Sequence, residues 1–263
     1  ALQTESLQMK SPIKDSINQF KCTSFLKELI PKGSLVHSFL FYGGDLEFAL
    51  AENERFVCAH TNKPVIHEFW ECALEDPERI HQIVTSPVFT FESENMFPIL
   101  QENWPTYKDP YLRSSLFFLL NRCSSNGLIS SGELSDKNFN PVALSYLKRF
   151  NPQNFHIVLD KESKFIKALS KTDADYLLVP VGKFNYNLFD HGKSRGYETT
   201  IVNHKALAAK LKEIDKDQKW IVVYNFHAEL LKLYEDYKIV GLDKYGNVKS
   251  NPKEWQELVI ANF

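Results

Sequence analysis

The chain has 263 residues, of which 43% are apolar and 24% are charged. This composition is typical of a soluble protein with one sizeable α/β domain, or one domain with a large insertion. The net charge of −2 argues against strong binding to duplex DNA, because neutralised phosphates supply most of the affinity of a DNA-binding domain.

Four scattered cysteines are expected to be buried free thiols in a reducing compartment, because no CxxC pair is present. No apolar run approaches the roughly 18 residues of a membrane span, and the polar start ALQTESLQMK does not resemble a secretory signal. We therefore expect a cytoplasmic protein. A metal site is not expected, since Cys58, His60 and His67 lie near one another without a second pair at zinc-like spacing.

The first half of the chain predicts alternating helices and strands. Apolar spacing predicts a helix over residues 15–30, a strand over 35–41, a turn at 42–44, a helix over 45–52 and a strand over 55–59. Helical spacing continues over residues 66–74. Asp76-Pro77 and Asp109-Pro110 each predict a capped helix start.

The second half returns to a regular rhythm after a polar, irregular stretch at 123–149. Strands are predicted over residues 155–159, 176–180 and 219–225, with one or two more near the end of the sequence. Helices are predicted over 161–170, 203–214 and 226–237. Strands alternating with helices predict an α/β fold whose mostly parallel sheet is covered on both faces.

Five strings occur in the order of a known family. They are LVHSFLFYGGDLEFAL, FVCAHTNKPVIHEFW, RSSLFFLLNRCSSNG, DADYLLVP and WIVVYNFHAELLKLY. The first string is similar to the family's strand with a Gly-x-Gly turn. The third keeps the Asn-Gly with which the family's string ends. The fourth is similar to the strand that precedes the family's catalytic Asp-Pro-Pro-Tyr. Over residues 12–245, the chain resembles the Dam-type DNA adenine-N6 methyltransferases.

This resemblance implies a Rossmann-like methyltransferase sheet with an inserted helical subdomain for target recognition. The methyltransferase-like domain is expected to comprise residues 1–62 and 151–263, and the insertion residues 63–150. By the same resemblance, the residues expected to contact DNA are Arg122, Asn126, Lys193 and Arg195.

The resemblance also implies a site for S-adenosylmethionine, and this site has lost most of its motif. In the strand and turn, Phe41 stands in place of the first glycine, while Gly43 keeps the second. His60 stands in place of an aspartate at the end of the next strand. The expected positions of the degenerate site are Lys21, His37, Phe39, Phe41, Gly43, His60 and Asn62.

The catalytic loop has diverged further. The family's Asp-Pro-Pro-Tyr accepts the amino hydrogens of a flipped adenine and stacks on the base. Its positions are taken here by Val179, Pro180, Val181 and Gly182. The side chain of valine cannot accept a hydrogen bond. Phe184 or Tyr186 could stack on the base but could not replace the missing acceptor.

Three functions remain open at this stage. The first is an inactive Dam-like homologue that binds duplex DNA or a protein, such as an active methyltransferase subunit, with no cofactor and with the pocket plugged by Phe41. The second is an active adenine methyltransferase with diverged motifs, in which Asp45 or Glu47 serves S-adenosylmethionine beside an open pocket. The third is a crevice reused for another small ligand and lined by His37, Phe41 and His60, at the carboxyl ends of the strands.

Overall fold

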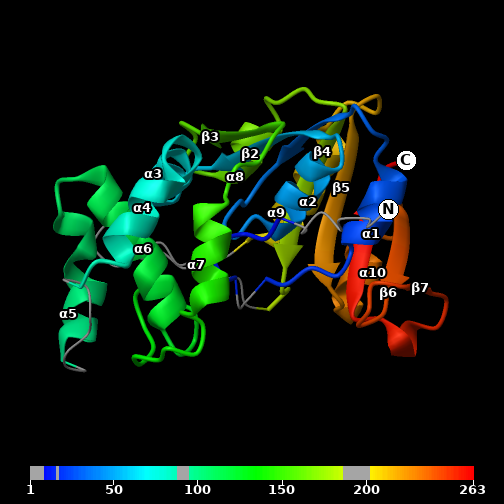
Figure 1. The fold of residues 1–263 in the computed structure, drawn as a ribbon. Helices are drawn as coiled ribbons and strands as arrows, with labels where there is room; N and C mark the ends of the chain where they lie inside the picture. The colour runs from blue at the N-terminus through cyan, green and yellow to red at the C-terminus, as the bar shows by residue number, and fades with distance from the viewer. Residues whose placement is uncertain (1–8, 16–17, 88–94, 186–201) are drawn as a thin grey trace, which may run out of the picture.

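The computed structural model describes residues 9–15, 18–87, 95–185 and 202–263. Within these residues one mixed sheet forms the centre of the molecule (Figure 1), with strand order β3-β2-β1-β4-β5-β8-β6-β7. The strands are β1 (Leu35–Ser38), β2 (Phe56–Thr61), β3 (Phe155–Leu159), β4 (Tyr176–Gly182), β5 (Lys219–Asn225), β6 (Lys238–Leu242), β7 (Val248–Lys249) and β8 (Glu257–Ala261).

The first five strands pair in parallel, and β8 is antiparallel to both of its neighbours. The chain runs from β1 outward through β2 and β3, then returns to the other side of β1 as β4. This reversal between β1 and β4 is the topological switch point at which open α/β sheets bind ligands. The predicted α/β fold with a parallel-dominated sheet is confirmed.

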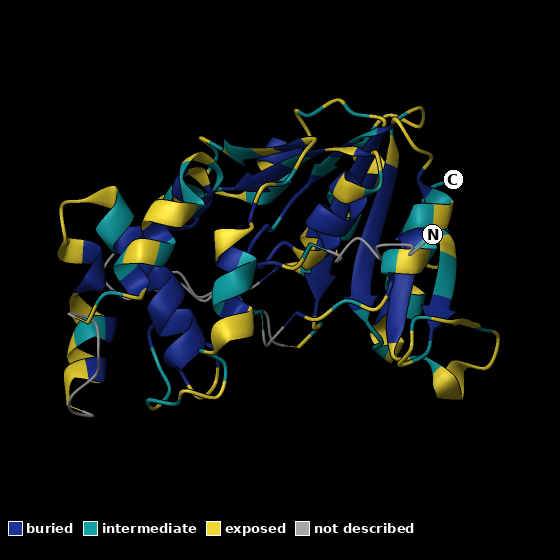
Figure 2. Ribbon diagram, in the orientation of Figure 1, coloured by how far each residue is buried: buried dark blue, intermediate teal, exposed yellow. Residues whose placement is uncertain are grey.

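Helices cover the sheet and extend beyond its β3 edge (Figure 1). They are α1 (Thr23–Leu29), α2 (Asp45–Glu52), α3 (Pro64–Glu75), α4 (Pro77–Val84), α5 (Met96–Asn103), α6 (Pro110–Cys123), α7 (Pro141–Lys148), α8 (Phe165–Leu169), α9 (His204–Glu213) and α10 (Ala228–Leu233), with short 3₁₀ turns η2 (Trp104–Thr106) and η4 (Pro252–Glu254). The central strands and α6 are the most completely buried elements (Figure 2).

The helices α3 to α7 all fall within the expected insertion, residues 63–150. Helix α6 packs against α3 and α4, and α3 also packs against β2 and β3. The helical content of this segment agrees with the sequence, while its division from the rest as a separate subdomain stays a prediction.

The helix predicted over residues 15–30 is wrong in its first half, because α1 begins only at Thr23. The backbone before it is hydrogen-bonded to distant parts of the chain instead of to itself. Lys14 N donates to Asn121 Oδ1 at 2.9 Å, and Lys21 N donates to Glu257 Oε2 at 2.9 Å. Tertiary contacts have replaced the helical bonds that the apolar spacing suggested.

Candidate ligand pocket at the switch point

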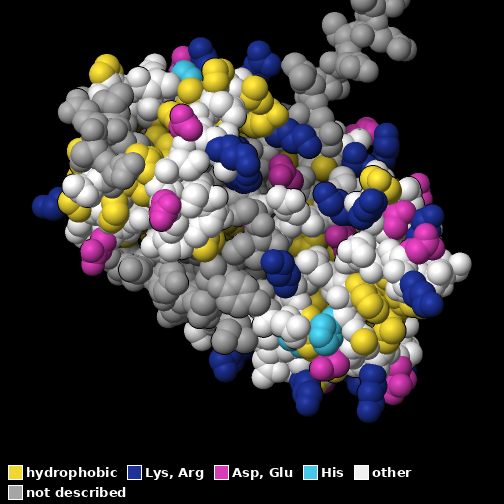
Figure 3. All heavy atoms as spheres, turned by 90° about the horizontal axis from the view of Figure 1, so that it is seen from below, with side chains coloured by type: hydrophobic (Ala, Val, Ile, Leu, Met, Phe, Trp, Pro, Cys, Tyr) yellow, Lys and Arg dark blue, Asp and Glu magenta, His cyan; other side chains and the backbone are white. Residues whose placement is uncertain are grey.

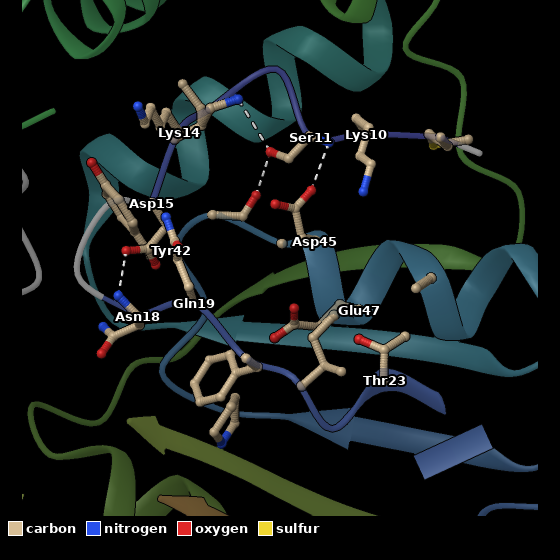
Figure 4. Close-up of a pocket in the computed structure, with 18 of the residues that line it drawn as sticks. Lys10, Ser11, Lys14, Asp15, Asn18, Gln19, Thr23, Tyr42, Asp45 and Glu47 are labelled. Carbon is tan, nitrogen blue, oxygen red and sulfur yellow. Dashed lines mark hydrogen bonds between the residues drawn. The ribbon is translucent and has the colours of Figure 1, made fainter. Parts of the chain in front are cut away.

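A pocket of about 860 Å³ opens beside the carboxyl ends of β1 and β4. Its walls come from the turn after β1, from α1 and α2, from Pro180 of β4, from Arg122 of α6, from Tyr146 of α7 and from the segment before α1. We call this segment, residues 9–15 and 18–22, the N-terminal strap. Figure 4 shows Ser11 of the strap directly over Asp45 of α2, with Glu47 lining the cavity below.

Two glycines shape the turn between β1 and α2. A Cβ atom at Gly43 would lie 2.7 Å from Cβ of Asp15, so a larger residue there would push the strap away. Gly44 has φ +89° and caps α2, where a side chain would meet the ring of Phe48. This turn needs glycine both for its backbone conformation and for the close approach of the strap.

Hydrogen bonds fix the strap to this turn. Ser11 N donates to Asp45 Oδ1 at 2.9 Å, and the Ser11 hydroxyl donates to the carbonyl of Gly43. Ile13 N in turn donates to Ser11 Oγ at 3.1 Å. The strap and the glycine turn therefore form one continuous rim of the pocket.

The pocket contains a buried carboxyl group. Glu47 is 4% exposed, and Ser38 Oγ donates to its Oε1 at 3.0 Å. Burial, with a smaller contribution from the neighbouring Asp45 and Asp15, raises the pKa of Glu47 to about 7, although the hydrogen bond from Ser38 opposes the shift. Glu47 can therefore exchange a proton near neutral pH.

Of the positions expected for the cofactor, Lys21 and Gly43 line this pocket. Phe41 does not plug it, contrary to what the inactive binding-module hypothesis required. Its ring is 2% exposed and packs in the core, with centroids 5.4 Å from Trp70 and 5.5 Å from Phe155. The pocket is open, so the expectation that no cofactor binds is not supported.

His37, Phe39 and His60 lie outside the lining of the pocket and form a partly buried network of their own. His37 Nδ1 is 2.6 Å from His60 Nε2, and His60 Nδ1 is 2.9 Å from Asp160 Oδ1. Burial lowers the pKa of His37 to about 4, with His60 adding to the effect. Asp160 can accept a proton from His60 Nδ1, and one further proton lies between His60 Nε2 and His37 Nδ1.

Phe39 stacks on His60 with ring centroids 4.4 Å apart, and Asn62 donates to the carbonyl of Ser163 at 2.8 Å. These side chains are held by each other and by the loop after β3. His37 and His60 contact each other, and Phe41 packs with Trp70 and Phe155, so none of the three lines the pocket at the switch point.

The end of β4 is apolar. Val179 and Val181 are fully buried. Gly182 has φ +80°, and a side chain there would collide with the amide oxygen of Asn18. The position expected to carry the family's aromatic residue is therefore filled by the strap.

Phe184, which follows β4, is also engaged. Its ring stacks with His204 at 4.4 Å and with His227 at 4.3 Å. His204 Nε2 lies 2.7 Å from the Phe184 carbonyl, and Nδ1 lies 2.9 Å from Tyr224 Oη. Because a carbonyl only accepts, Nε2 carries the proton and Tyr224 donates to Nδ1. Since two rings cannot stack on one face of a third, both faces of Phe184 are covered.

The residues expected to contact DNA are dispersed. Arg122 is 9% exposed and lines the pocket, while Asn126 accepts from Leu128 N at 3.0 Å in the loop after α6. Lys193 and Arg195 lie outside the described residues. In Figure 3, lysines, arginines and carboxylates are interspersed over the face seen from below.

In residues 9–15, 18–87, 95–185 and 202–263, no group of three or more His, Cys, Asp or Glu is placed to hold a metal ion. Nor does any helix in these residues have the length and apolarity to cross a membrane.

Sequence reasoning missed the strap as a wall of the pocket. Asp15 and Asn18 are short polar residues within the segment 15–30 that was predicted as a helix, and Ser11 precedes that segment. Such residues favour turns and local caps over helix interiors. These short polar residues were the signal in the sequence that the segment before α1 is not helical.

No family model matches the chain, and no curated protein matches it. Among solved structures, it is similar to a TehB-like SAM-dependent methyltransferase from Corynebacterium glutamicum, with 9% identity, a TM-score of 0.38, and coverage of 92% of this chain and 86% of that chain. The glycopeptide N-methyltransferase MtfA gives 8% identity, a TM-score of 0.42, and coverage of 94% and 90%.

A precorrin-6y C5,15-methyltransferase from Geobacter metallireducens gives 8% identity, a TM-score of 0.36, and coverage of 91% and 83%. Similarity at this level carries no argument about the site. The fold assignment therefore rests on the order and direction of the strands.

Proposed function

We propose that the chain is a Dam-like methyltransferase homologue that binds an S-adenosylmethionine-type ligand in the switch-point pocket and does not methylate adenine. The observation that carries the proposal is the open pocket at the Gly43–Gly44 turn, beside a β4 end with no acceptor side chain among its described residues. The proposal therefore combines a retained ligand site with the loss of adenine methylation.

The size and charge of the pocket support such a ligand. Its volume of about 860 Å³ lies within the range of small-molecule and cofactor sites. The first turn of α2 carries Asp45 and Glu47, so negative charge already complements the positive end of the helix dipole. This arrangement disfavours a phosphate group at that position and favours a ligand with a neutral or cationic group there.

The β4 end supports the loss of adenine methylation. Transfer to an exocyclic amine needs an acceptor for the amino hydrogens and a surface on which the base stacks. Val179 and Val181 supply neither, and the ring and carbonyl of Phe184 are both engaged by His204. A flipped base would have to displace these contacts.

The biological role would then lie in binding. As partners we propose duplex DNA or a protein, such as an active methyltransferase subunit. The net charge of −2 and the mixed charges on the face in Figure 3 favour the protein partner, because DNA affinity depends on an excess of positive charge.

The test is calorimetry and thermal unfolding with S-adenosylmethionine and S-adenosylhomocysteine. A ligand at a hundredfold excess over its dissociation constant stabilises the folded state by about 2.7 kcal/mol. Gly43→Val, which displaces the strap, should abolish this shift. Gly33→Ala is a control away from the pocket: no atom lies within 4 Å of its Cβ position, but its φ of +83° disfavours alanine, so it should lower stability slightly and leave the ligand-induced shift intact.

Absence of a shift with either ligand at millimolar concentration would rule out the proposed ligand and favour a crevice reused for another molecule. A methylation assay with labelled cofactor and adenine-containing duplex DNA completes the test. Transfer of label to adenine would support the active enzyme with diverged motifs instead.

A further inference from the structure

The family-like string at the end of α6 has a role that its expected contact with DNA does not explain. Asn121 is fully buried, and Arg122 is 9% exposed. Both point away from solvent. What they contact is the backbone of the N-terminal strap, more than a hundred residues earlier in the chain.

Asn121 uses its whole amide in this contact. Its Oδ1 accepts from Lys14 N at 2.9 Å, and its Nδ2 donates to the carbonyl of Lys14 at 2.9 Å. The same Nδ2 donates at 3.1 Å to the carbonyl of Gly127, which has φ +72°. Only a side-chain amide offers a donor and an acceptor in this geometry, so Asn121 locks one strap residue to the loop after α6.

Arg122 holds the strap at Ser11 and Pro12, just before Lys14. Its Nε donates to the carbonyl of Pro12 at 2.9 Å, and Nη2 donates to the carbonyl of Ser11 at 3.4 Å. Burial lowers the pKa of Arg122, while Asp45 acts in the opposite direction. Because the buried guanidinium donates to two backbone carbonyls, it fixes the position of those carbonyls.

The other side of the same strap residues forms the pocket. Ser11 is bonded to Gly43 and Asp45, and Lys14 lines the cavity while its Nζ donates to Asn138 Oδ1 at 2.6 Å. The strap is therefore fixed by α6 on one side and by the glycine turn on the other. Loss of either attachment would leave one wall of the pocket without support.

We propose that Asn121 and Arg122 are positioning residues for ligand binding, which hold the strap as a wall of the pocket and so couple helix α6 to the ligand. The identity of the ligand rests on the proposed function, whereas the anchoring of the strap does not. A partner that moves α6 would change the affinity of the pocket through these two side chains.

Hydrogen–deuterium exchange of the strap tests the anchoring without any ligand. Asn121→Ala should raise the exchange rate of peptides covering residues 9–22 by about tenfold, because the amide of Lys14 loses its acceptor. Asn121→Asp keeps the acceptor and loses the donor, so it should raise the exchange rate by a smaller factor. This variant also keeps the test open if the alanine variant does not fold. Arg122→Lys should loosen the same peptides.

The matched control is Gln101→Ala. Gln101 is 7% exposed and donates to the carbonyls of Ser131 and Gly132, so it is a buried amide of the same helical region that does not touch the strap. It should lower stability and leave the exchange of the strap unchanged. Unchanged strap exchange in all Asn121 and Arg122 variants would overturn the inference.

Calorimetry with S-adenosylhomocysteine gives the second readout. We expect the dissociation constant to rise by about tenfold in Asn121→Asp, within the usual range of coupling between sites, and to stay within about twofold of wild type in Gln101→Ala. Loosened exchange with unchanged affinity would show a purely structural role and reject the positioning role. If the wild-type protein binds no S-adenosylhomocysteine, the proposed function fails, and the exchange experiment alone decides the inference.

Discussion

Glu47 is the residue of the pocket whose ionisation should be visible in the stability of the protein. Burial raises its pKa from an ordinary 4.5 to about 7. Between pH 4.5 and pH 7, the folded state therefore keeps a proton on Glu47 that the unfolded state has already released. Stability from this group is present at low pH and is lost as the pH rises through about 7.

We expect the free energy of unfolding to fall by up to about 3 kcal/mol from this group between pH 5 and pH 8. Glu47→Gln keeps an acceptor for Ser38 and cannot ionise, so its decline over the same range should be smaller by that amount. Urea unfolding of both proteins at four pH values measures the difference. Parallel curves would show that Glu47 ionises normally.

Phe41 gives a second prediction at the scale of the residue. Its ring packs with Phe48, Trp70 and Phe155. Phe41→Gly, which restores the family's first glycine, should therefore cost at least about 3 kcal/mol of stability without opening the pocket further.

Phe41→Leu is the control, because it keeps most of the apolar volume and should cost about 1 kcal/mol. Denaturant midpoints for both variants, with ligand affinity measured in parallel, make the comparison. A glycine variant as stable as wild type, with tighter ligand binding, would mean that the ring does block the pocket.

At the scale of the element, the caps were the most predictable feature. Asp76 accepts from Arg79 N, and Asp109 accepts from Tyr111 N and Leu112 N, as the Asp-Pro signals predicted. Helix α7 was not predicted, although Asn140-Pro141 carries the same kind of signal. Its short apolar pattern lay within a polar segment that was interpreted as irregular.

Asp109→Ala should destabilise the protein by about 1 kcal/mol, the usual effect of losing an N-cap. Asp109→Asn keeps the acceptor and should lie within a few tenths of a kcal/mol of wild type. Thermal unfolding of the three proteins at one pH measures the effect. Equal losses in both variants would attribute the effect to the charge of Asp109, including its ion pair with Arg79 at 3.8 Å.

The βα rhythm predicted most of the sheet, because buried strands such as β4 and β5 are continuous apolar runs. The site was harder to predict. A family string suggests roles for Arg122 or His60, but the actual contacts depend on which distant backbone lies beside them. Local sequence could not show that Lys14 lies against Asn121, since 107 residues separate them.

At the scale of the whole molecule, the order of the strands predicts a gradient of local stability. Strands β4, β5 and β8 each have a neighbour on both sides, and β4 and β8 are buried throughout. At the ends of the sheet, β3 and β7 are partly exposed. Interior strands should therefore open only with global unfolding.

Native-state hydrogen exchange should show the slowest amides in β4, β5 and β8, and exchange at least about a hundredfold faster in β3. Addition of denaturant should bring the two rates together near the unfolding transition. Protection in β3 equal to that in β5 would point to a further chain or segment paired with this edge.

The strap also sets an order of events during synthesis. It is among the first parts of the described chain to be translated, but Asn121 follows Lys14 by 107 residues and Glu257 follows Lys21 by 236. At ordinary translation rates, the interval before Glu257 is made is on the order of tens of seconds. A nascent chain that has reached β4 therefore already contains the anchors of the strap at Gly43, Asp45, Asn121 and Arg122, while the contact of Lys21 with Glu257 can form only after the last strand is made.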